Sequence, residues 1–142
     1  MSKLPLDTRI VSAFPGTGKS MLAQQSYAFV DVDFPEYKSD MGPYLEQIRE
    51  ALKIPGVTVL VPTWPQLRKA LQDAGMKYAL FYPKRDLKFD YNKRYVDRGS
   101  PKAFVDNMWW KWDEYLESCE QDPADISMCM AQSQARLSDY FL

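Results

Sequence analysis

The fold of this chain is decided by the stretch TRIVSAFPGTGKS, residues 8–20. Residues 8–14 are apolar and rich in β-branched side chains, which predicts a short buried strand. Residues 13–20 match the P-loop pattern G-x-x-x-x-G-K-[ST], except that Ala13 stands where the first glycine is expected. The helix-compatible stretch MLAQQS follows at 21–26. Strand, glycine-rich turn and helix in this order are the context in which the pattern binds phosphate groups.

There is a chemical reason for each residue type that the pattern specifies. Gly16 and Gly18 let the backbone wrap closely around phosphate oxygens, so that N–H groups point inward. Lys19 would reach the β- and γ-phosphates, and Ser20 would bind Mg²⁺. Ala13 in place of the first glycine costs little in phosphate contacts if the φ angle at this position is negative. The expected nucleotide-binding residues are Pro15, Gly16, Thr17, Gly18, Lys19 and Ser20. The alternative is a glycine turn that precedes a helix by chance.

Two aspartates end the next predicted strand, at residues 27–33. Asp31 and Asp33 are two apart and would share one face, at the carboxyl end of the strand where α/β sheets bind ligands. Asp31 is the expected Mg²⁺ residue, and Asp33 is expected to orient or deprotonate an acceptor hydroxyl. The third strand ends in VPTW (61–64) with no acidic residue, so a Walker B aspartate is missing there. The alternative is an acidic strand end in a solvated turn.

The rest of the chain alternates between short apolar stretches and helix-compatible ones. Further strands are predicted over residues 57–61, 77–82 and 126–130. Helices are predicted over 44–53, 64–74, 84–98 and 102–121, with a last helical turn over 137–142. This alternation predicts a single α/β domain over residues 1–142, with three layers around a mostly parallel sheet of about five strands.

Residues 84–98, KRDLKFDYNKRYVDR, carry a local excess of positive charge. Arg94 and Arg98 are four apart and would share a helix face, with Arg85 further upstream. Their guanidinium groups could close over a transferred phosphoryl group, as a short mobile helical lid over about residues 84–100 that excludes water. The alternative is a solvated amphipathic helix. The helix after it should bury most of its aromatic stripe, with Trp110 off the stripe and exposed, while the acidic stretch 113–125 should be solvated.

Composition removes several kinds of site. The 142 residues include no histidine, which excludes a Ser-His-Asp or Cys-His hydrolase and a histidine-based metal site. Eighteen Lys and Arg against nineteen Asp and Glu give a formal net charge of −1, which argues against a long non-specific nucleic-acid surface. Cys119 and Cys129 suggest neither a metal site nor a disulfide framework. No apolar run is long enough for a bilayer and no secretory signal is visible, so a cytoplasmic location without a membrane partner is expected.

The chain resembles a group of small phage-encoded P-loop kinases, described as nucleotide or adenylate-kinase-like. The resemblance rests on AFPGTGKS (13–20), on VDVDF (30–34) with Pro35 and Tyr37, and on residues 78–116, which include the block RYVDRG (94–99). It implies a P-loop NTPase fold with a reduced lid, Lys19 and Ser20 as ATP–Mg²⁺ residues, and Arg94 and Arg98 as lid arginines. Phage kinases that phosphorylate 5-hydroxymethyluracil within DNA look similar in the phosphate loop. The resemblance also implies the cytoplasm of a phage-infected bacterium.

The expected function is therefore ATP-dependent transfer of the γ-phosphate to a nucleotide, a nucleoside or a modified-base hydroxyl, the last within DNA. The residues expected to act in catalysis are Lys19, Asp33, Arg94 and Arg98. A monophosphate acceptor would need further arginines, for which Arg49 and Arg68 are available, whereas a hydroxyl acceptor suits the paired aspartates better. The alternatives are a non-kinase NTP-binding or accessory ATPase module, and a P-loop domain kept only for interaction. Both a monomer and a homodimer are compatible with the sequence.

Overall fold

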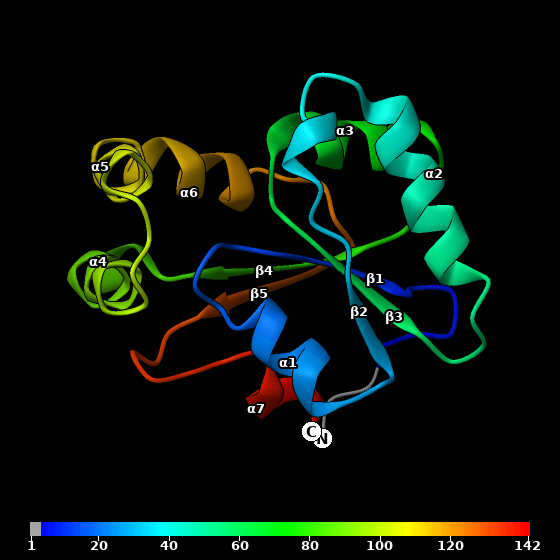
Figure 1. Ribbon diagram of the computed structural model, residues 1–142, viewed down its shortest axis with the longest axis horizontal. Coiled ribbons are helices and arrows are strands. Elements are labelled where there is room, and N and C mark those ends of the chain that lie inside the picture. The colour runs from blue at the N-terminus through cyan, green and yellow to red at the C-terminus, as the bar shows by residue number, and fades with distance from the viewer. Residues whose placement is uncertain (1–3) are drawn as a thin grey trace.

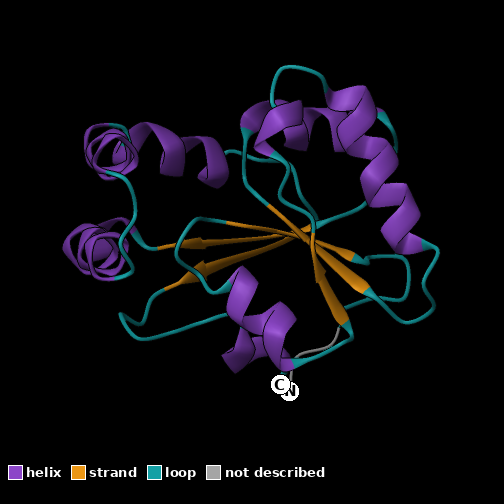
Figure 2. Ribbon diagram, in the orientation of Figure 1, coloured by secondary structure: helices purple, strands orange, loops and turns teal. Residues whose placement is uncertain are grey.

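Five parallel strands form one sheet in the order β2-β3-β1-β4-β5. The computed structural model describes residues 4–142, and helices cover both faces of this sheet (Figures 1 and 2). The strands are β1 (Ile10–Ala13), β2 (Phe29–Asp31), β3 (Thr58–Val61), β4 (Ala79–Pro83) and β5 (Ile126–Met130). The helices are α1 (Lys19–Gln25), α2 (Met41–Leu52), α3 (Pro65–Asp73), α4 (Lys88–Asp97), α5 (Lys102–Trp110), α6 (Trp112–Glu120) and α7 (Ser138–Phe141), with short 3-10 helices η1 (Pro35–Tyr37) and η2 (Arg85–Leu87). The predicted α/β class and parallel sheet are confirmed.

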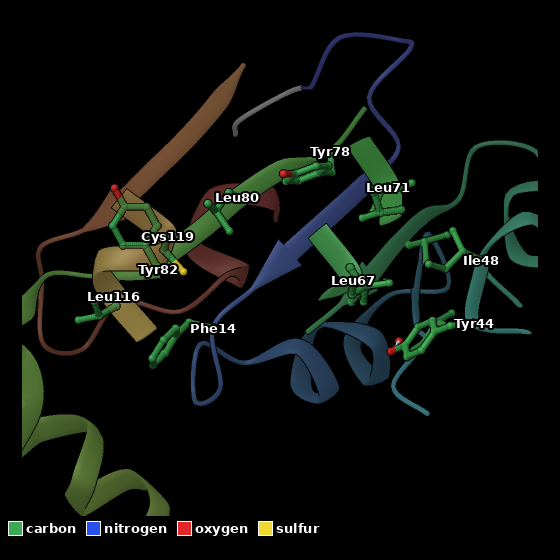
Figure 3. Packing of buried hydrophobic residues seen from close by; sticks show 14 of the residues in the cluster. Phe14, Tyr44, Ile48, Leu67, Leu71, Tyr78, Leu80, Tyr82, Leu116 and Cys119 are labelled. Carbon is green, nitrogen blue, oxygen red and sulfur yellow. Dashed lines mark hydrogen bonds between the residues drawn. The ribbon is translucent and has the colours of Figure 1, made fainter. Parts of the chain in front are cut away.

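The two faces of the sheet bury different helices. Leu22 of α1 and Leu137 and Phe141 near α7 pack with one set of strand residues. On the opposite face, α2, α3, α4, α5 and α6 pack over a larger apolar cluster, of which Figure 3 shows side chains extending from Leu116 and Cys119 to Ile48 and Tyr44. Adjacent strands β1 and β3 are thus followed by helices on opposite faces. This is a topological switch point, where open α/β sheets bind ligands at the carboxyl ends of their strands.

The aromatic helix predicted over residues 102–121 is two helices, which corrects the sequence prediction. Lys111 has φ −106° and ψ 12°, so α5 ends before it and α6 begins after it. The break allows Trp112 to enter the core and donate from Nε1 to the carbonyl of Arg85 at 2.9 Å. Trp110 is 81% exposed, as its place off the apolar stripe predicted.

The middle of the segment predicted as a lid is packed into the body of the domain. Residues 85–97 form η2 and α4, and Tyr91 and Tyr95 of α4 are buried in the large cluster. Tyr91 packs against Phe14 and Trp112, with ring centroids 6.5 and 5.7 Å apart. Burying two tyrosines stabilises this position of the helix by several kcal/mol, of the order of 1.5–3 kcal/mol for each large side chain. The carboxyl end of α4 is exposed over residues 96–98.

Candidate functional site

The connection between β1 and α1 is a tight loop, Pro15–Gly18, which we call the glycine loop. Gly16 and Gly18 have φ angles of +91° and +99°, a conformation that side chains rarely adopt. A Cβ at Gly16 would lie 3.0 Å from Tyr95 and 3.1 Å from Tyr91, so α4 also requires glycine there. Ala13 lies in β1 at a negative φ, since no residue of 4–142 other than glycine has a positive one. The replaced first glycine of the pattern therefore causes no strain.

The carbonyl groups of the glycine loop are held by atoms outside it. Tyr95 Oη donates to the carbonyl of Pro15 at 2.7 Å, and Arg94 Nη1 donates to that of Gly16 at 2.8 Å. The N–H of Leu137 donates to the carbonyl of Thr17 at 2.8 Å. In a trans peptide the next N–H points the opposite way, so these contacts turn the N–H groups of Gly16 and Gly18 away from α4 and α7.

Five N–H groups of this region have no protein acceptor among residues 4–142. They belong to Gly16, Gly18, Lys19, Ser20 and Met21, and all five residues line the same cavity. The N–H of Thr17 instead bonds back to the carbonyl of Phe14 at 3.2 Å. Several free N–H groups converging in a glycine turn form a binding site for an anion such as phosphate.

The first hydroxyl of α1 lies beside the end of β2. Ser20 Oγ donates to Asp31 Oδ2 at 3.1 Å. The other oxygen, Asp31 Oδ1, is buried and has no hydrogen-bond partner in the described chain. Burial raises the pKa of Asp31, while the nearby Lys19 ammonium and the Ser20 hydroxyl lower it. An unsatisfied carboxylate oxygen next to a hydroxyl is suited to a cation.

These groups fit Mg²⁺ as it is bound with a nucleotide. Mg²⁺ prefers oxygen ligands and commonly takes one or two carboxylates, with the remainder from water and substrate phosphates. Ser20 and Asp31 supply the protein oxygens, and residues 4–142 hold no group of three or more Asp, Glu, Cys or His side chains that could bind a metal without a substrate. Asp31 lies beside Ser20 as a Mg²⁺ residue would need to, and its role in binding Mg²⁺ stays a prediction.

Lys19 is the partly buried cation of the site. Burial lowers its pKa, opposed by the carboxylates of Asp31 and Asp33, and Arg98 lowers it further by repulsion. The charge of Lys19 therefore interacts with the carboxylates of Asp31 and Asp33 and with the guanidinium of Arg98. Asp33 itself follows the end of β2, is exposed and lines the cavity. The two predicted aspartates are therefore near the glycine loop but differ in burial.

The cavity at the carboxyl edge of the sheet has a volume of about 890 Å³, and we call it the main cavity. It lies within the range of about 300–1,000 Å³ typical of ligand pockets. Among its lining residues are four that the sequence analysis missed: Lys38, Trp64, Phe104 and Arg136. Trp64 follows the end of β3 by three residues, so the strand-end rule that selected Asp31 could have selected it, whereas Arg136 lies six residues beyond the end of β5. Lys38 and Phe104 carry no such signal.

The two predicted lid arginines have different environments. Arg94 is bonded by Nη1 to Gly16 and by Nη2 to the carbonyls of Ser133 and Ala135, the latter at 3.3 Å. It also packs its guanidinium 4.1 Å from the ring centroid of Tyr91. Arg94 therefore ties the glycine loop to the loop after β5 (131–137), and its donors are directed at backbone.

Arg98 has most of its donors available. It is exposed, donates from Nε to Ser100 Oγ at 2.8 Å and lines the main cavity. Its guanidinium packs 5.0 Å from the ring centroid of Tyr95 and 5.5 Å from that of Phe104, which limits its freedom. Arg85, in contrast, pairs with Glu120 at 2.8 Å and does not line the main cavity. Of the three arginines in the segment predicted as a lid, Arg98 alone both lines the main cavity and has most of its donors available.

The arginines considered for a phosphate acceptor are engaged elsewhere. Arg49 pairs with Glu46 at 2.8 Å on the exposed face of α2. Arg68 is buried against Asp122 at 2.7 Å and also donates to the carbonyl of Thr63 and to Ser118. The prediction that residues 113–125 form a solvated face is thus wrong at Asp122, whose side chain is 1% exposed because Arg68 neutralises it.

Comparison of the chain with protein-family models gives no match, and comparison with curated proteins gives none either. Over residues 4–142, no helix has the length and apolar character needed to cross a membrane.

Proposed function

We propose that this protein is an ATP-dependent phosphotransferase of the P-loop kinase type, which transfers the γ-phosphate to a nucleotide-like acceptor. The observation that carries the proposal is the glycine loop and the start of α1: five backbone N–H groups there have no protein acceptor among residues 4–142, and their residues line the main cavity near the Ser20–Asp31 pair. The position of the loop at the switch point of a parallel sheet supports it. The resemblance of residues 13–20 to phage P-loop kinases points the same way.

In this proposal the loop and Lys19 bind the β- and γ-phosphates of ATP. The inward N–H groups hold phosphate oxygens, and the ammonium of Lys19 neutralises their charge. Ser20 and Asp31 would hold Mg²⁺, which when bound with ATP neutralises negative charge on the β- and γ-phosphates. Burial lowers the pKa of Lys19, and the carboxylates of Asp31 and Asp33 oppose this by favouring its ammonium form.

Asp33 and Arg98 act on the transferred group. The carboxylate of Asp33 orients the acceptor and accepts its proton, if the acceptor is a hydroxyl. Arg98 stabilises the charge that spreads over the phosphoryl oxygens during transfer. Arg94 holds the glycine loop in shape through the carbonyl of Gly16, which is a positioning role instead of the catalytic one predicted from the sequence.

The end of β3 argues for a kinase over a motor-type ATPase. Residues 61–64 read Val-Pro-Thr-Trp, and Trp64 lines the main cavity where a Walker B carboxylate would act on water. The accessory NTP-binding module considered from the sequence would bind ATP without transferring phosphate. The transfer experiment below distinguishes such a module from a kinase.

The test is transfer of label from γ-labelled ATP in the presence of Mg²⁺ to a panel of nucleosides, nucleoside monophosphates and DNA containing 5-hydroxymethyluracil. Wild-type protein should label one acceptor class, and Lys19→Ala should abolish transfer. Asp33→Asn should reduce turnover by about 10²–10⁴-fold, the usual contribution of a general base. Lys69→Ala and Asp73→Asn are matched controls, because these residues pair with each other on exposed α3. Label on no acceptor, or undiminished transfer by Lys19→Ala, would contradict the proposal.

A further inference from the structure

A side recess of about 250 Å³ opens next to the main cavity. The two share Pro15, Lys38, Trp64 and Phe104 among their lining residues, so one ligand can extend from the recess into the main cavity. Pockets for whole small ligands usually measure about 300–1,000 Å³. The recess is therefore suited to one part of a ligand whose remainder lies in the main cavity.

Aromatic side chains with fixed positions form part of the wall of this recess. Trp64 is held edge-to-face by Tyr44, with ring centroids 5.5 Å apart. Phe104 is held in the same way by Tyr95, at 5.2 Å. Rigid aromatic walls favour a flat ring, because stacking gains energy without ordering flexible side chains.

Two neutral amides with spare hydrogen-bonding capacity line the recess. Asn107 donates from Nδ2 to Tyr115 Oη at 2.8 Å, and Gln66 donates from Nε2 to the carbonyl of Lys38 at 3.4 Å. Their amide oxygens have no partner among residues 4–142. An amide that offers both a donor and an acceptor can pair with the edge of a heterocyclic base.

The recess offers little to a phosphate group. Its buried cation, Arg68, directs its donors at Asp122, Ser118 and Thr63. The other cation is Lys38, on the part of the wall shared with the main cavity, where its Nζ lies 5.1 Å from the ring centroid of Trp64. A phosphate dianion buried in the recess would lose its hydration and could gain only the charge of Lys38, at the shared wall.

Resting on the proposed function, we infer that the side recess binds the uncharged heteroaromatic ring of the acceptor, and that the group phosphorylated is a hydroxyl attached to that ring or its sugar. The hydroxyl oxygen forms a bond to the γ-phosphorus of ATP. The bond from that phosphorus to the bridging oxygen breaks, and ADP leaves with its electron pair. The hydroxyl proton passes to the carboxylate of Asp33.

Binding of the ring is measured without ATP, so that it is independent of the transfer reaction. Wild-type protein is titrated with thymidine and 2′-deoxyadenosine while tryptophan fluorescence is followed, and Trp64→Phe shows how much of the change comes from the recess. The variants are Asn107→Leu and Gln66→Leu, both at exposed positions where folding is not at risk. Gln47→Leu, on exposed α2, is the matched control. The two recess variants should each raise the Kd of the nucleoside about tenfold, which corresponds to loss of one hydrogen bond.

Two further arms identify the acceptor. The monophosphates dTMP and dAMP should bind no more tightly than the nucleosides, and a single-stranded oligonucleotide shows whether the ring is preferred free or within DNA; either source supports the recess. Nucleoside binding that is absent, or equal in wild type, Asn107→Leu and Gln66→Leu, would overturn the inference, as would a preference of more than tenfold for monophosphates. If nucleosides bind through these residues but ATP donates no phosphate, the assignment of the recess as a ring-binding site is supported and the proposed function is contradicted. If transfer occurs and the recess variants leave the acceptor KM unchanged, the recess fails alone.

Discussion

Replacing Arg94 with alanine distinguishes the positioning role that we propose for it from the catalytic role predicted from the sequence. The change removes hydrogen bonds to three backbone carbonyls, those of Gly16, Ser133 and Ala135. It also removes the packing of the guanidinium on Tyr91, at 4.1 Å from the ring centroid. The glycine loop then keeps only two of its external contacts, from Tyr95 and Leu137.

The size of the effect follows from these contacts. Each neutral-acceptor hydrogen bond contributes about 0.5–1.5 kcal/mol, so three contribute about 1.5–4.5 kcal/mol. Water can hydrate the freed carbonyls because Arg94 is only partly buried, so we expect a loss of about 2 kcal/mol and a Tm lower by roughly 6–10 °C. Reordering the loop around the triphosphate costs about 1 kcal/mol, the share of the Gly16 bond, which raises the Kd of ATP about five- to tenfold.

Calorimetric titration with ATP and Mg²⁺, thermal unfolding and steady-state transfer together test this account. Arg94→Lys should show most of the same loss, because an ammonium keeps the charge but cannot reach three carbonyls at once. Arg49→Ala, on exposed α2, is the control for removing an arginine. A variant that binds ATP as tightly as wild type but transfers phosphate much more slowly would refute the positioning role and restore the catalytic one.

Three further predictions follow from individual contacts. Arg98→Ala should lower kcat about 10²–10³-fold and change the KM of ATP less than twofold, as measured by steady-state kinetics; equal losses in both would make Arg98 a ground-state binding residue. Asp122→Ala should lower the free energy of unfolding, measured with denaturant, by about 3–5 kcal/mol, because it leaves Arg68 buried without a partner. The control Asp113→Ala, at an exposed position, should lower it by about 0.5 kcal/mol or less, and similar values for the two variants would be inconsistent with the buried pair. In native protein at pH 8, a thiol reagent should react with the exposed Cys129 alone. Cys119 should stay unreactive because it is buried and burial raises its pKa to about 11. Rapid reaction of two equivalents of reagent would show that Cys119 is accessible.

The order of strands and helices was predictable because it depends on local pattern. The buried strand before the glycine loop and the apolar stretch at 57–61 were both found from their sequence, and both are strands of the central sheet. The contact of Ser20 with Asp31 was also predictable in outline, since parallel strands bring their carboxyl ends to one edge.

What the sequence could not provide depends on contacts between distant residues. Lys111 lies in a stretch whose apolar spacing continues on both sides, so the helix break there follows from the burial of Trp112 and not from a local signal. The pairing of Arg68 with Asp122 spans more than fifty positions and converts a surface-like acidic residue into a buried one. The role of Arg94 likewise depends on loops that only the folded chain brings together.

In the proposed function, the glycine loop with Lys19 binds the triphosphate of ATP. Calorimetric titration of wild type and Lys19→Ala with ATP and Mg²⁺ tests this, with AMP as the ligand that lacks the β- and γ-phosphates. We expect saturable binding of ATP by wild type, much weaker binding of AMP, and a loss of ATP affinity by about 10²-fold in Lys19→Ala, since two charge-assisted contacts are removed. Equal affinities of wild type and Lys19→Ala for ATP, or no binding of ATP to wild type, would contradict it.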